Sequence, residues 1–545
     1  MPTDDPILEA AQRLLGYESL RPGQREAIQS LLDGRDTLAV LATGAGKSAI
    51  YELAGPLLGG PTVVVSPLLA LQRDQTAALE ARGHAVAVAL NSSETSRQRQ
   101  QILGHLAGGD RPDFVFLAPE QLANGDVLAR VAELRPVLLA VDEAHLVSRW
   151  GPDFRPDYLR IGPAVESLGR PVLVALTATA APPVRDEILQ RLQMRDPAVL
   201  VRGFARANIR LAVHSYFTDE DHKQEVLTRD IAEAVGGRGR GIVYAATHHR
   251  VERLAATIAS RHLRVAAYHA GLPKAVRADV EQRFHDDELD VVVATIAFGM
   301  GIDKADVRWV FHADVSGSLD EYYQELGRAG RDGAPAEAVL YFRREDLALP
   351  RMYAAGGGPS REDLVALAQA LAGAGGPVRL ADMAEQLGLS RNRTEAAAMA
   401  LADAGGVTLE PDGTLHVTGS TSRAAEEASE LVVARRAMER TRVDTMEAYA
   451  EHRGCRWKFM LEYFGEPAAD RCGHCDNDER AEANSDESHP GRPFERGSRV
   501  RHHVFGDGEV LGYVGSSILV AFDRAGYKRL DLGLVTEGHL LDATT

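Results

Sequence analysis

The stretch Leu38-Ala-Val-Leu-Ala-Thr-Gly-Ala-Gly-Lys-Ser48 decides the fold of the N-terminal part of this chain. It begins with an apolar run, as in a buried strand, and the glycines before Lys47 suit a turn that opens a helix. In such a strand–turn–helix unit, successive backbone N–H groups converge on phosphate at the helix N-terminus. The stretch therefore predicts a phosphate-binding loop at the edge of a parallel sheet.

This loop has the residues that a nucleoside triphosphate site needs. We expect Lys47 to hold the β- and γ-phosphates of ATP and Ser48 to hold Mg²⁺. The residues expected to bind the nucleotide here are Thr43, Gly44, Gly46, Lys47 and Ser48. Leu41 stands where the usual motif has its first glycine, so a chance Gly-Lys-Ser turn is the alternative for this motif taken alone.

A second motif, Asp142-Glu143-Ala144-His145, follows the apolar run Leu138–Val141. Parallel sheets gather ligands at the carboxyl ends of their strands, which is where these acids fall. We expect Asp142 to hold Mg²⁺ through water, Glu143 to orient or deprotonate the attacking water, and His145 to belong to the same catalytic set. A lone Asp-Glu pair is usually a solvated strand end, but the two motifs together indicate an ATPase.

Apolar runs alternate with segments of helical length in two successive regions of the chain, which predicts two doubly wound α/β domains in tandem. The predicted strands of the first are Val63–Val65, Phe114–Phe116, Val137–Val141 and Val172–Val174, and those of the second are Ile242–Tyr244, Val265–Tyr268, Val291–Val293 and Trp309–Phe311. A Gly-rich break near 354–360 ends this rhythm, and the helices and hairpin that follow predict a winged helix.

The chain thus divides into six predicted segments. They are two α/β domains at 1–208 and 209–353, a winged-helix-like domain at 360–420, a helical zinc-binding subdomain at 423–480, an acidic linker at 481–493 and a small β-barrel at 494–545.

Composition narrows the class of protein. The chain has 545 residues, 45% of them hydrophobic, and a formal net charge of −17, so binding to a polyanion would need local gathering of positive charge. Its three cysteines all lie between positions 455 and 475, unlike a disulfide-stapled secreted scaffold. No apolar run suits a membrane span, and the acidic start does not suit a signal peptide, so we expect a cytoplasmic protein with no membrane partner.

Several further motifs, in order along the first 345 or so residues, are similar to the RecQ family of superfamily-two DNA helicases. They are Leu15–Tyr17, Arg21–Gln24, Val65–Leu68, Ala118–Glu120, Ser148–Pro156, Leu176–Ala180, Tyr268–Leu272, Ala297–Asp303 and Tyr322–Gly333. The resemblance implies two RecA-like domains and an ATP-dependent helicase that moves 3′ to 5′ along single-stranded DNA in repair or recombination.

The resemblance also implies roles for residues outside the two nucleotide motifs. Gln24 would read the adenine edge, with Tyr17 and Arg21 stacking on the base. In the motif that contains Gln324, Arg331 together with Arg328 would reach the γ-phosphate as an arginine finger. Trp150, Phe154 and Arg155 occupy the place of the family's aromatic-rich loop, where they would stack on bases of any sequence.

The cysteine segment resembles the zinc subdomain of the same family. Its predicted ligands are Cys455, Cys472, Cys475 and Asp478, the last standing where the family has a fourth cysteine. A carboxylate is an acceptable zinc ligand, so we expect a structural Zn²⁺. The alternative is a metal-free remnant held by aromatic packing.

Two accessory modules are open to more than one interpretation. Arg391 and Arg393 begin the helix that would meet DNA in a winged helix, which is as commonly a spacer or a protein-binding module. The C-terminal segment resembles the tudor-like domain that ends UvrD-type helicases and would dock a protein partner, a solubility cap being the alternative.

Two rival functions remain beside a helicase acting on single-stranded and tailed or forked DNA. One is an RNA helicase, which the Trp150 loop and the cysteine segment disfavour. The other is a DNA-stimulated ATPase that acts as a translocase, annealing protein or scaffold without processive unwinding.

Overall fold

The protein is described here by a computed structural model. It describes residues 5–42, 44–67, 69–83, 85–90, 111–148, 156–216, 220–298, 304–356, 358–410, 413–483, 493–494, 498–514, 517–522, 526–538 and 540–543.

The first α/β domain is built on a parallel seven-stranded sheet with the order β3-β4-β2-β5-β6-β1-β7. Its strands are β1 Thr37–Leu41, β2 Thr62–Val65, β3 Ala87–Leu90, β4 Phe114–Leu117, β5 Leu138–Val141, β6 Val172–Thr177 and β7 Ala198–Arg202. Its helices are α1 Pro6–Ala10, α2 Gln24–Leu32, α3 Ser48–Leu58, α4 Leu69–Ala81, α6 Gly125–Glu133, α7 Ile161–Ser167 and α8 Pro182–Arg191. Strands β1 and β5 are buried throughout and are separated only by β6, so the loops that follow them open at the same edge.

The second α/β domain repeats this plan with a parallel six-stranded sheet of order β10-β11-β9-β12-β13-β8. Its strands are β8 Ile209–Tyr216, β9 Gly241–Tyr244, β10 Val265–Tyr268, β11 Val291–Ala294, β12 Trp309–His312 and β13 Ala336–Arg343. Its helices are α9 Glu220–Gly237, α10 His248–Ala259, α11 Lys274–His285, α12 Leu319–Leu326 and α13 Ala348–Gly356. The predicted pair of doubly wound, RecA-like domains is thereby confirmed.

The next segment has the helix, strand, helix, helix, strand, strand order of a winged helix. Its elements are α14 Arg361–Gly373, β14 Val378–Arg379, α15 Leu380–Leu387, α16 Arg391–Asp403, β15 Val407–Leu409 and β16 Thr414–Val417, and the strands form an antiparallel sheet. They enclose a separate core that includes Leu364, Leu367 and Leu401.

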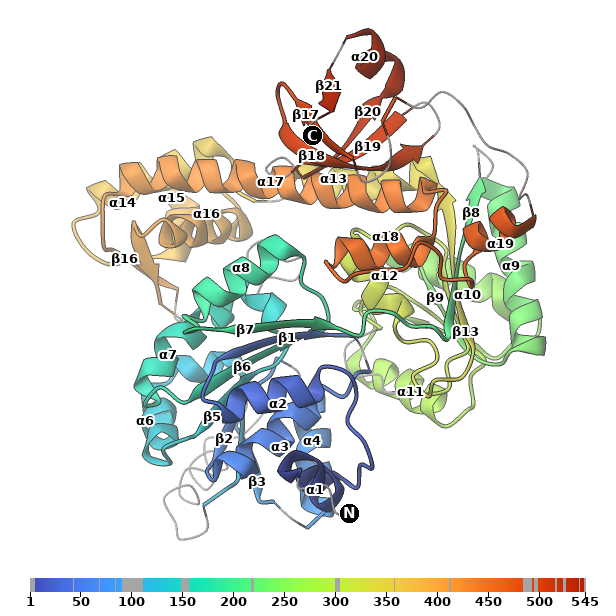
Figure 1. The fold of residues 1–545 in the computed structure, drawn as a ribbon. Helices are drawn as coiled ribbons and strands as arrows, with labels where there is room; N and C mark the ends of the chain where they lie inside the picture. Colours follow the sequence, from blue (N-terminus) through green and yellow to red (C-terminus); the bar gives the residue numbers. More distant parts are fainter. Residues whose placement is uncertain are drawn as a thin grey trace.

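A long helix, α17 Thr421–Glu451, follows the winged helix and leads to the zinc subdomain. Figure 1 shows it running from the winged helix to the zinc subdomain, with the C-terminal sheet above it. The zinc subdomain adds α18 Arg456–Tyr463 and α19 Asp476–Ala483. The C-terminal antiparallel sheet comprises β17 Arg499–His502, β18 Gly506–Val514, β19 Ser517–Phe522, β20 Gly526–Asp531 and β21 Leu541–Ala543, together with α20 Leu532–Glu537.

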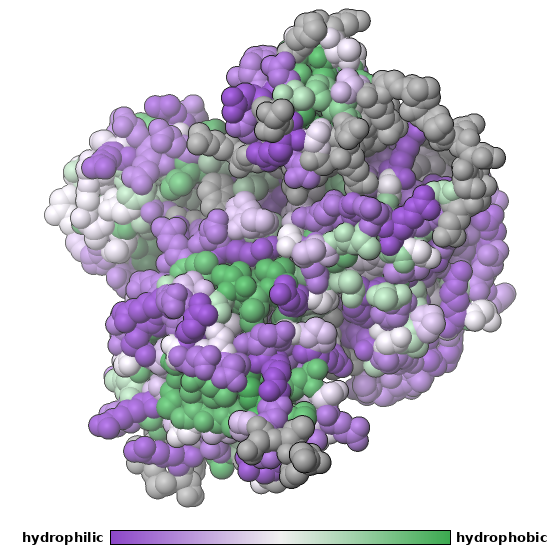
Figure 2. Space-filling view, in the orientation of Figure 1, coloured by the Kyte–Doolittle hydropathy of each residue, from purple (hydrophilic) through white to green (hydrophobic). Residues whose placement is uncertain are grey.

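The C-terminal sheet curves into a half-barrel that rests on α17, where Arg529 pairs with Glu451. Figure 2 shows that most of the visible face of the molecule is hydrophilic, with green apolar areas gathered mainly on the first α/β domain. Within the described ranges, no helix combines the length and the apolar character needed to cross a bilayer.

Candidate nucleotide site and zinc site

The phosphate-binding loop joins β1 to α3 as the sequence predicts. Gly44 and Gly46 adopt left-handed backbone conformations, with φ of 79° and 69°, which glycine accepts without strain. The Nζ of Lys47 lies within the loop, 3.3 Å from the carbonyl oxygen of Leu41 and 3.5 Å from that of Ala42. The ammonium group therefore lies where the terminal phosphates of a nucleotide would arrive.

The acidic motif stands beside this loop, at the end of β5. The Asp142 carboxylate accepts hydrogen bonds from Ser66 Oγ at 3.4 Å and from the Glu143 backbone N–H at 3.0 Å. Burial and the neighbouring charge of Glu143 raise the pKa of Asp142 to about 7, and Lys47 opposes this rise. A buried carboxylate supplies the hard oxygen ligand that Mg²⁺ prefers, and the nearby charge of Lys47 favours its ionised form.

Glu143 occupies a strained backbone position. Its φ is 48°, in the left-handed region that residues with a side chain rarely adopt. Such outliers concentrate at active sites, where the surrounding structure holds them. The conformation follows directly from the sharp turn after β5 and lets two consecutive acids, Asp142 and Glu143, face the same site.

A chain of polar contacts connects Glu143 to the second RecA-like domain. His145 Nδ1 lies 3.4 Å from Glu143 Oε2 and 2.8 Å from Thr177 Oγ1. Thr177 Oγ1 donates to the carbonyl oxygen of Thr179 at 3.0 Å, and Gln324 Nε2 donates to Thr179 Oγ1 at 2.9 Å. Gln324 lies on α12, so this chain crosses from one domain to the other.

Arg331 faces the phosphate-binding loop from the second domain. A Cβ added at Gly44 would lie 3.8 Å from the Cγ of Arg331. Burial lowers the pKa of Lys47, and the charge of Arg331 adds to this effect. Arg328 lies near the hydroxyl group of Tyr244, whose raised pKa is due mainly to burial. The structure thus places Lys47, Asp142, Glu143 and Arg331 around one site.

The loop that contains Arg328 and Arg331 is held by two residues that the sequence analysis missed, Arg206 and Asn208. Arg206 donates to the carbonyl oxygens of Ala329 at 2.9 Å and Gly330 at 2.8 Å. Asn208 Nδ2 donates to Gly330 at 2.8 Å and to Ala334 at 3.0 Å. Their partners lie more than 120 positions away in the sequence, and no local pattern marks either residue.

The residues predicted to recognise the base border the same loop. Gln24 is buried, and its Nε2 donates to the carbonyl oxygens of Ala45 at 2.9 Å and Gly46 at 2.8 Å. Its Oε1 accepts from the backbone N–H of Arg21 at 2.8 Å, and Arg21 also donates to Gly44. Tyr17 is exposed. Gln24 therefore links the base-recognition segment to the phosphate loop, and its contact with adenine stays a prediction.

Several predicted site residues lie outside the described residues. They are Thr43 of the phosphate-binding loop and Trp150, Phe154 and Arg155 of the aromatic-rich loop. Of the two winged-helix arginines, Arg393 forms a bidentate pair with Asp363, from Nη2 at 2.8 Å and from Nε at 3.2 Å, whereas Arg391 is exposed at the start of α16.

The predicted metal ligands come together. The ligand atoms of Cys455, Cys472, Cys475 and Asp478 all lie within 4.8 Å of one another. Mutual hydrogen bonds among the three thiols lower the pKa of Cys475 and raise the pKa of Cys472, so binding of zinc to all three would release protons. Asp478 Oδ2 is held by the backbone N–H groups of Cys472 at 2.8 Å and Gly473 at 3.1 Å. Three thiols and one carboxylate fit a closed tetrahedral zinc site.

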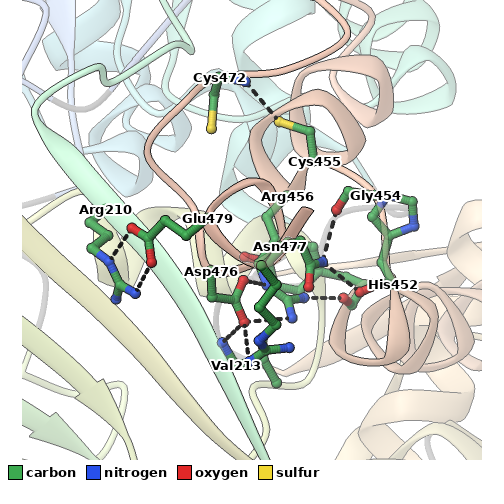
Figure 3. Close-up of polar contacts among 12 residues, drawn as sticks. Arg210, Val213, His452, Gly454, Cys455, Arg456, Cys472, Asp476, Asn477 and Glu479 are labelled. Atoms are coloured by element: carbon green, nitrogen blue, oxygen red, sulfur yellow. Dashed lines mark hydrogen bonds and ion pairs between the residues drawn. The ribbon is translucent and has the colours of Figure 1, made fainter. Parts of the chain in front are cut away.

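The zinc subdomain is docked on β8, the edge strand of the second sheet (Figure 3). Asp476 pairs with the buried Arg456 and accepts a hydrogen bond from the Val213 backbone N–H at 3.1 Å. Arg210 of β8 forms a bidentate ion pair with Glu479, with N–O distances of 2.8 and 2.6 Å. Trp457 Nε1 donates to the carbonyl oxygen of Ile209 at 3.0 Å. These contacts cover an edge that would otherwise present unpaired backbone groups.

Comparison with known proteins places each of these parts in a family. Residues 21–188 match the DEAD/DEAH box helicase family, residues 222–333 match the helicase conserved C-terminal domain, and residues 422–479 match the RecQ zinc-binding family. The crystal structure of the DUF1998 helicase MrfA bound to DNA has a TM-score of 0.54 at 16% identity, covers 78% of this chain and 64% of that one, and shows a shared fold alone.

Two relatives share more of the sequence. The ATP-dependent DNA helicase RecQ of Haemophilus influenzae is 41% identical over 342 residues, which are 63% of this chain and 54% of the relative. The probable ATP-dependent DNA helicase RecS of Bacillus subtilis is 38% identical over 335 residues, which are 61% of this chain and 66% of the relative. The chain thus spans between about half and two thirds of the length of these curated relatives.

Proposed function

The chain belongs to the RecQ family of helicases, and from that premise we propose that it is an ATP-dependent DNA helicase. It couples ATP hydrolysis to 3′ to 5′ movement along single-stranded DNA and separates tailed or forked duplexes in DNA repair and recombination. The direction and the biological setting are those that the family resemblance implies.

One observation carries the proposal: the nucleotide site lies where the two RecA-like domains meet. Lys47 and the acids come from the first domain, and Arg331 comes from the second. A nucleotide bound between them is held from both sides, so binding favours closure of the two domains and hydrolysis favours opening. A cycle of closure and opening on a strand is what drives a translocating helicase.

The residues of the site divide the work of phosphoryl transfer. Lys47 neutralises the terminal phosphates, Ser48 and Asp142 hold Mg²⁺, and Glu143 positions the attacking water. Arg331 supplies positive charge to the γ-phosphate as charge develops on it. Mg²⁺ bound there screens phosphate charge, and Zn²⁺ in the cysteine site keeps the subdomain folded.

The test is strand separation on duplexes with either a 3′ or a 5′ single-stranded tail, with ATP and Mg²⁺ and with a Glu143→Gln variant as the control. We expect separation from the 3′ tail alone, and none by the variant. If DNA stimulates hydrolysis while neither tail supports separation, the protein is a translocase or scaffold and the helicase proposal fails. A cytoplasmic location and a protein partner for the C-terminal half-barrel stay predictions.

A further inference from the structure

The linker between the two RecA-like domains is held by the zinc subdomain. The linker runs from Gly203 to Asn208, between β7 and β8. The Glu466 carboxylate accepts hydrogen bonds from two consecutive linker N–H groups, those of Gly203 at 3.0 Å and Phe204 at 2.8 Å. Hydrogen bonds to a carboxylate are about twice as strong as neutral ones, so Glu466 fixes the point at which the chain leaves the first domain.

An aromatic stack reinforces this contact. The rings of Phe464 and Phe204 stack with centroids 4.5 Å apart and planes 18° apart, and both side chains are fully buried. The ring of Phe464 also lies against that of Tyr323 of α12, with centroids 5.0 Å apart. The hydroxyl group of Tyr323 in turn donates to the carbonyl oxygen of Phe204 at 3.0 Å. One side chain of the zinc subdomain therefore touches both the linker and the helix that carries Gln324.

The same short segment reaches the first domain. Arg185 of α8 donates to the carbonyl oxygen of Phe464, and its Nε donates to Ala180 at 2.8 Å, directly after Thr179. A neighbouring contact leads to the second domain, where Tyr463 OH donates to Asp320 of α12 at 2.5 Å. The segment from Tyr463 to Glu466 thus touches the first domain, the second domain and the linker between them.

The linker in turn holds the arginine loop. Arg206 and Asn208, which follow Phe204, donate to the backbone carbonyls of Ala329 and Gly330, next to Arg328 and Arg331. A continuous set of contacts therefore runs from Glu466 through the linker to the residue expected to contact the γ-phosphate.

We propose that Glu466 and Phe464 are positioning residues for ATP hydrolysis: through the interdomain linker they place the Arg328–Arg331 loop against the nucleotide. The inference rests on the proposed ATPase function. It gives the zinc subdomain a part in the chemical step, because the position of the segment from Tyr463 to Glu466 depends on a folded zinc site on the same subdomain.

The test compares Glu466→Ala and Glu466→Gln with Glu462→Gln, a matched change of an exposed glutamate on α18. We expect Glu466→Ala to lower kcat for DNA-stimulated ATP hydrolysis by about 10- to 100-fold with little change in the KM for ATP, since misplacing a transition-state group costs kcat. Glu466→Gln keeps one oxygen acceptor and should recover part of the loss. Glu462→Gln should match the wild-type protein.

A second measurement separates positioning from a general loss of stability. The complex of MgADP with aluminium fluoride mimics the transferred phosphoryl group and requires the arginine, whereas ADP alone does not. Glu466→Ala should bind ADP normally and lose affinity for the aluminium fluoride complex by at least about tenfold, with unchanged zinc content and Tm. The inference is overturned if kcat and this affinity stay within twofold of the wild type, or if the losses follow zinc content and Tm. A wild-type protein without DNA-stimulated hydrolysis would instead refute the proposed function.

Discussion

Gln324 Nε2 of the second RecA-like domain donates a hydrogen bond to Thr179 Oγ1 of the first, over 2.9 Å. Thr179 lies just after β6, and its carbonyl oxygen accepts from Thr177, which contacts His145. A residue of one domain is therefore connected to Glu143 of the other through both the hydroxyl and the backbone carbonyl of Thr179, then Thr177 and His145. Such a chain breaks whenever the domains separate, so its state reports whether the cleft is closed.

Gln324 and Thr179 should act as a unit in catalysis, through the hydrogen bond between them. Gln324→Ala removes the donor and Thr179→Val removes the acceptor at nearly constant volume. We expect each variant to lower DNA-stimulated kcat for ATP about tenfold, and the double variant to lower it no further, because both remove the same interaction. Steady-state ATP hydrolysis with single-stranded DNA checks this. Fully multiplicative losses would show that the two residues act separately.

Removal of Glu143, the acid proposed to orient water, should stop turnover without preventing nucleotide binding. We expect Glu143→Gln to lower kcat at least about 100-fold, as for loss of a general base. Nucleotide affinity should stay near that of the wild type, because Lys47 and the glycine loop are intact. Hydrolysis assays beside titration with a fluorescent ATP analogue measure both quantities. The assignment of Glu143 is wrong if turnover falls less than fivefold.

The unusual fourth ligand of the cysteine site should bind zinc. Asp478→Ala removes the carboxylate and leaves two backbone N–H groups without their acceptor, so we expect loss of zinc to a competing chelator and a lower Tm. Asp478→Cys restores the ligand set of the family and should retain one zinc ion per chain. Asp470→Asn, a change at an exposed carboxylate, is the control. The measurement is the zinc content of each variant after exposure to a chelator. Equal retention of zinc by all variants would exclude Asp478 as a ligand.

The sequence predicts the local motifs of this chain, but it does not predict the contacts between residues far apart along it. The strand before Lys47 and the strand before Asp142 are continuous apolar runs followed by glycines or acids, so both their type and their edge were predictable. The sequence pattern does not predict the longest strands of the second sheet, β8 and β13, because polar residues such as Arg210 and Glu337 interrupt their apolar runs. These two residues pair with each other across neighbouring strands, at 2.6 Å.

The contacts between modules could not be predicted from local patterns at all. Glu466 meets the N–H groups of Gly203 and Phe204 across more than 260 positions, and a glutamate beside a glycine has no periodicity that would mark it. The cysteine spacing was informative for the opposite reason, since zinc geometry demands particular residue types close together.

The two arginines at the start of α16 should differ in function. Arg393 is tied to Asp363, and that carboxylate also caps α14 through the Ser360 backbone N–H at 3.2 Å. Arg391 instead lines a cavity of about 740 Å³ between the winged helix and the first RecA-like domain. Of the pair, Arg391 is therefore the one expected to contact a DNA phosphate.

Fluorescence anisotropy of labelled single-stranded and tailed DNA over a range of salt concentrations tests this difference. Arg391→Ala should weaken binding to all sequences alike and reduce the slope of log affinity against log salt by about one, as for loss of one phosphate contact. Arg393→Ala should leave that slope unchanged and lower the stability of the winged helix by up to about 1 kcal/mol, the usual value of an exposed ion pair. The reverse pattern would mean that the ion pair with Asp363 opens on DNA, and that the recognition surface lies on the opposite side of α16.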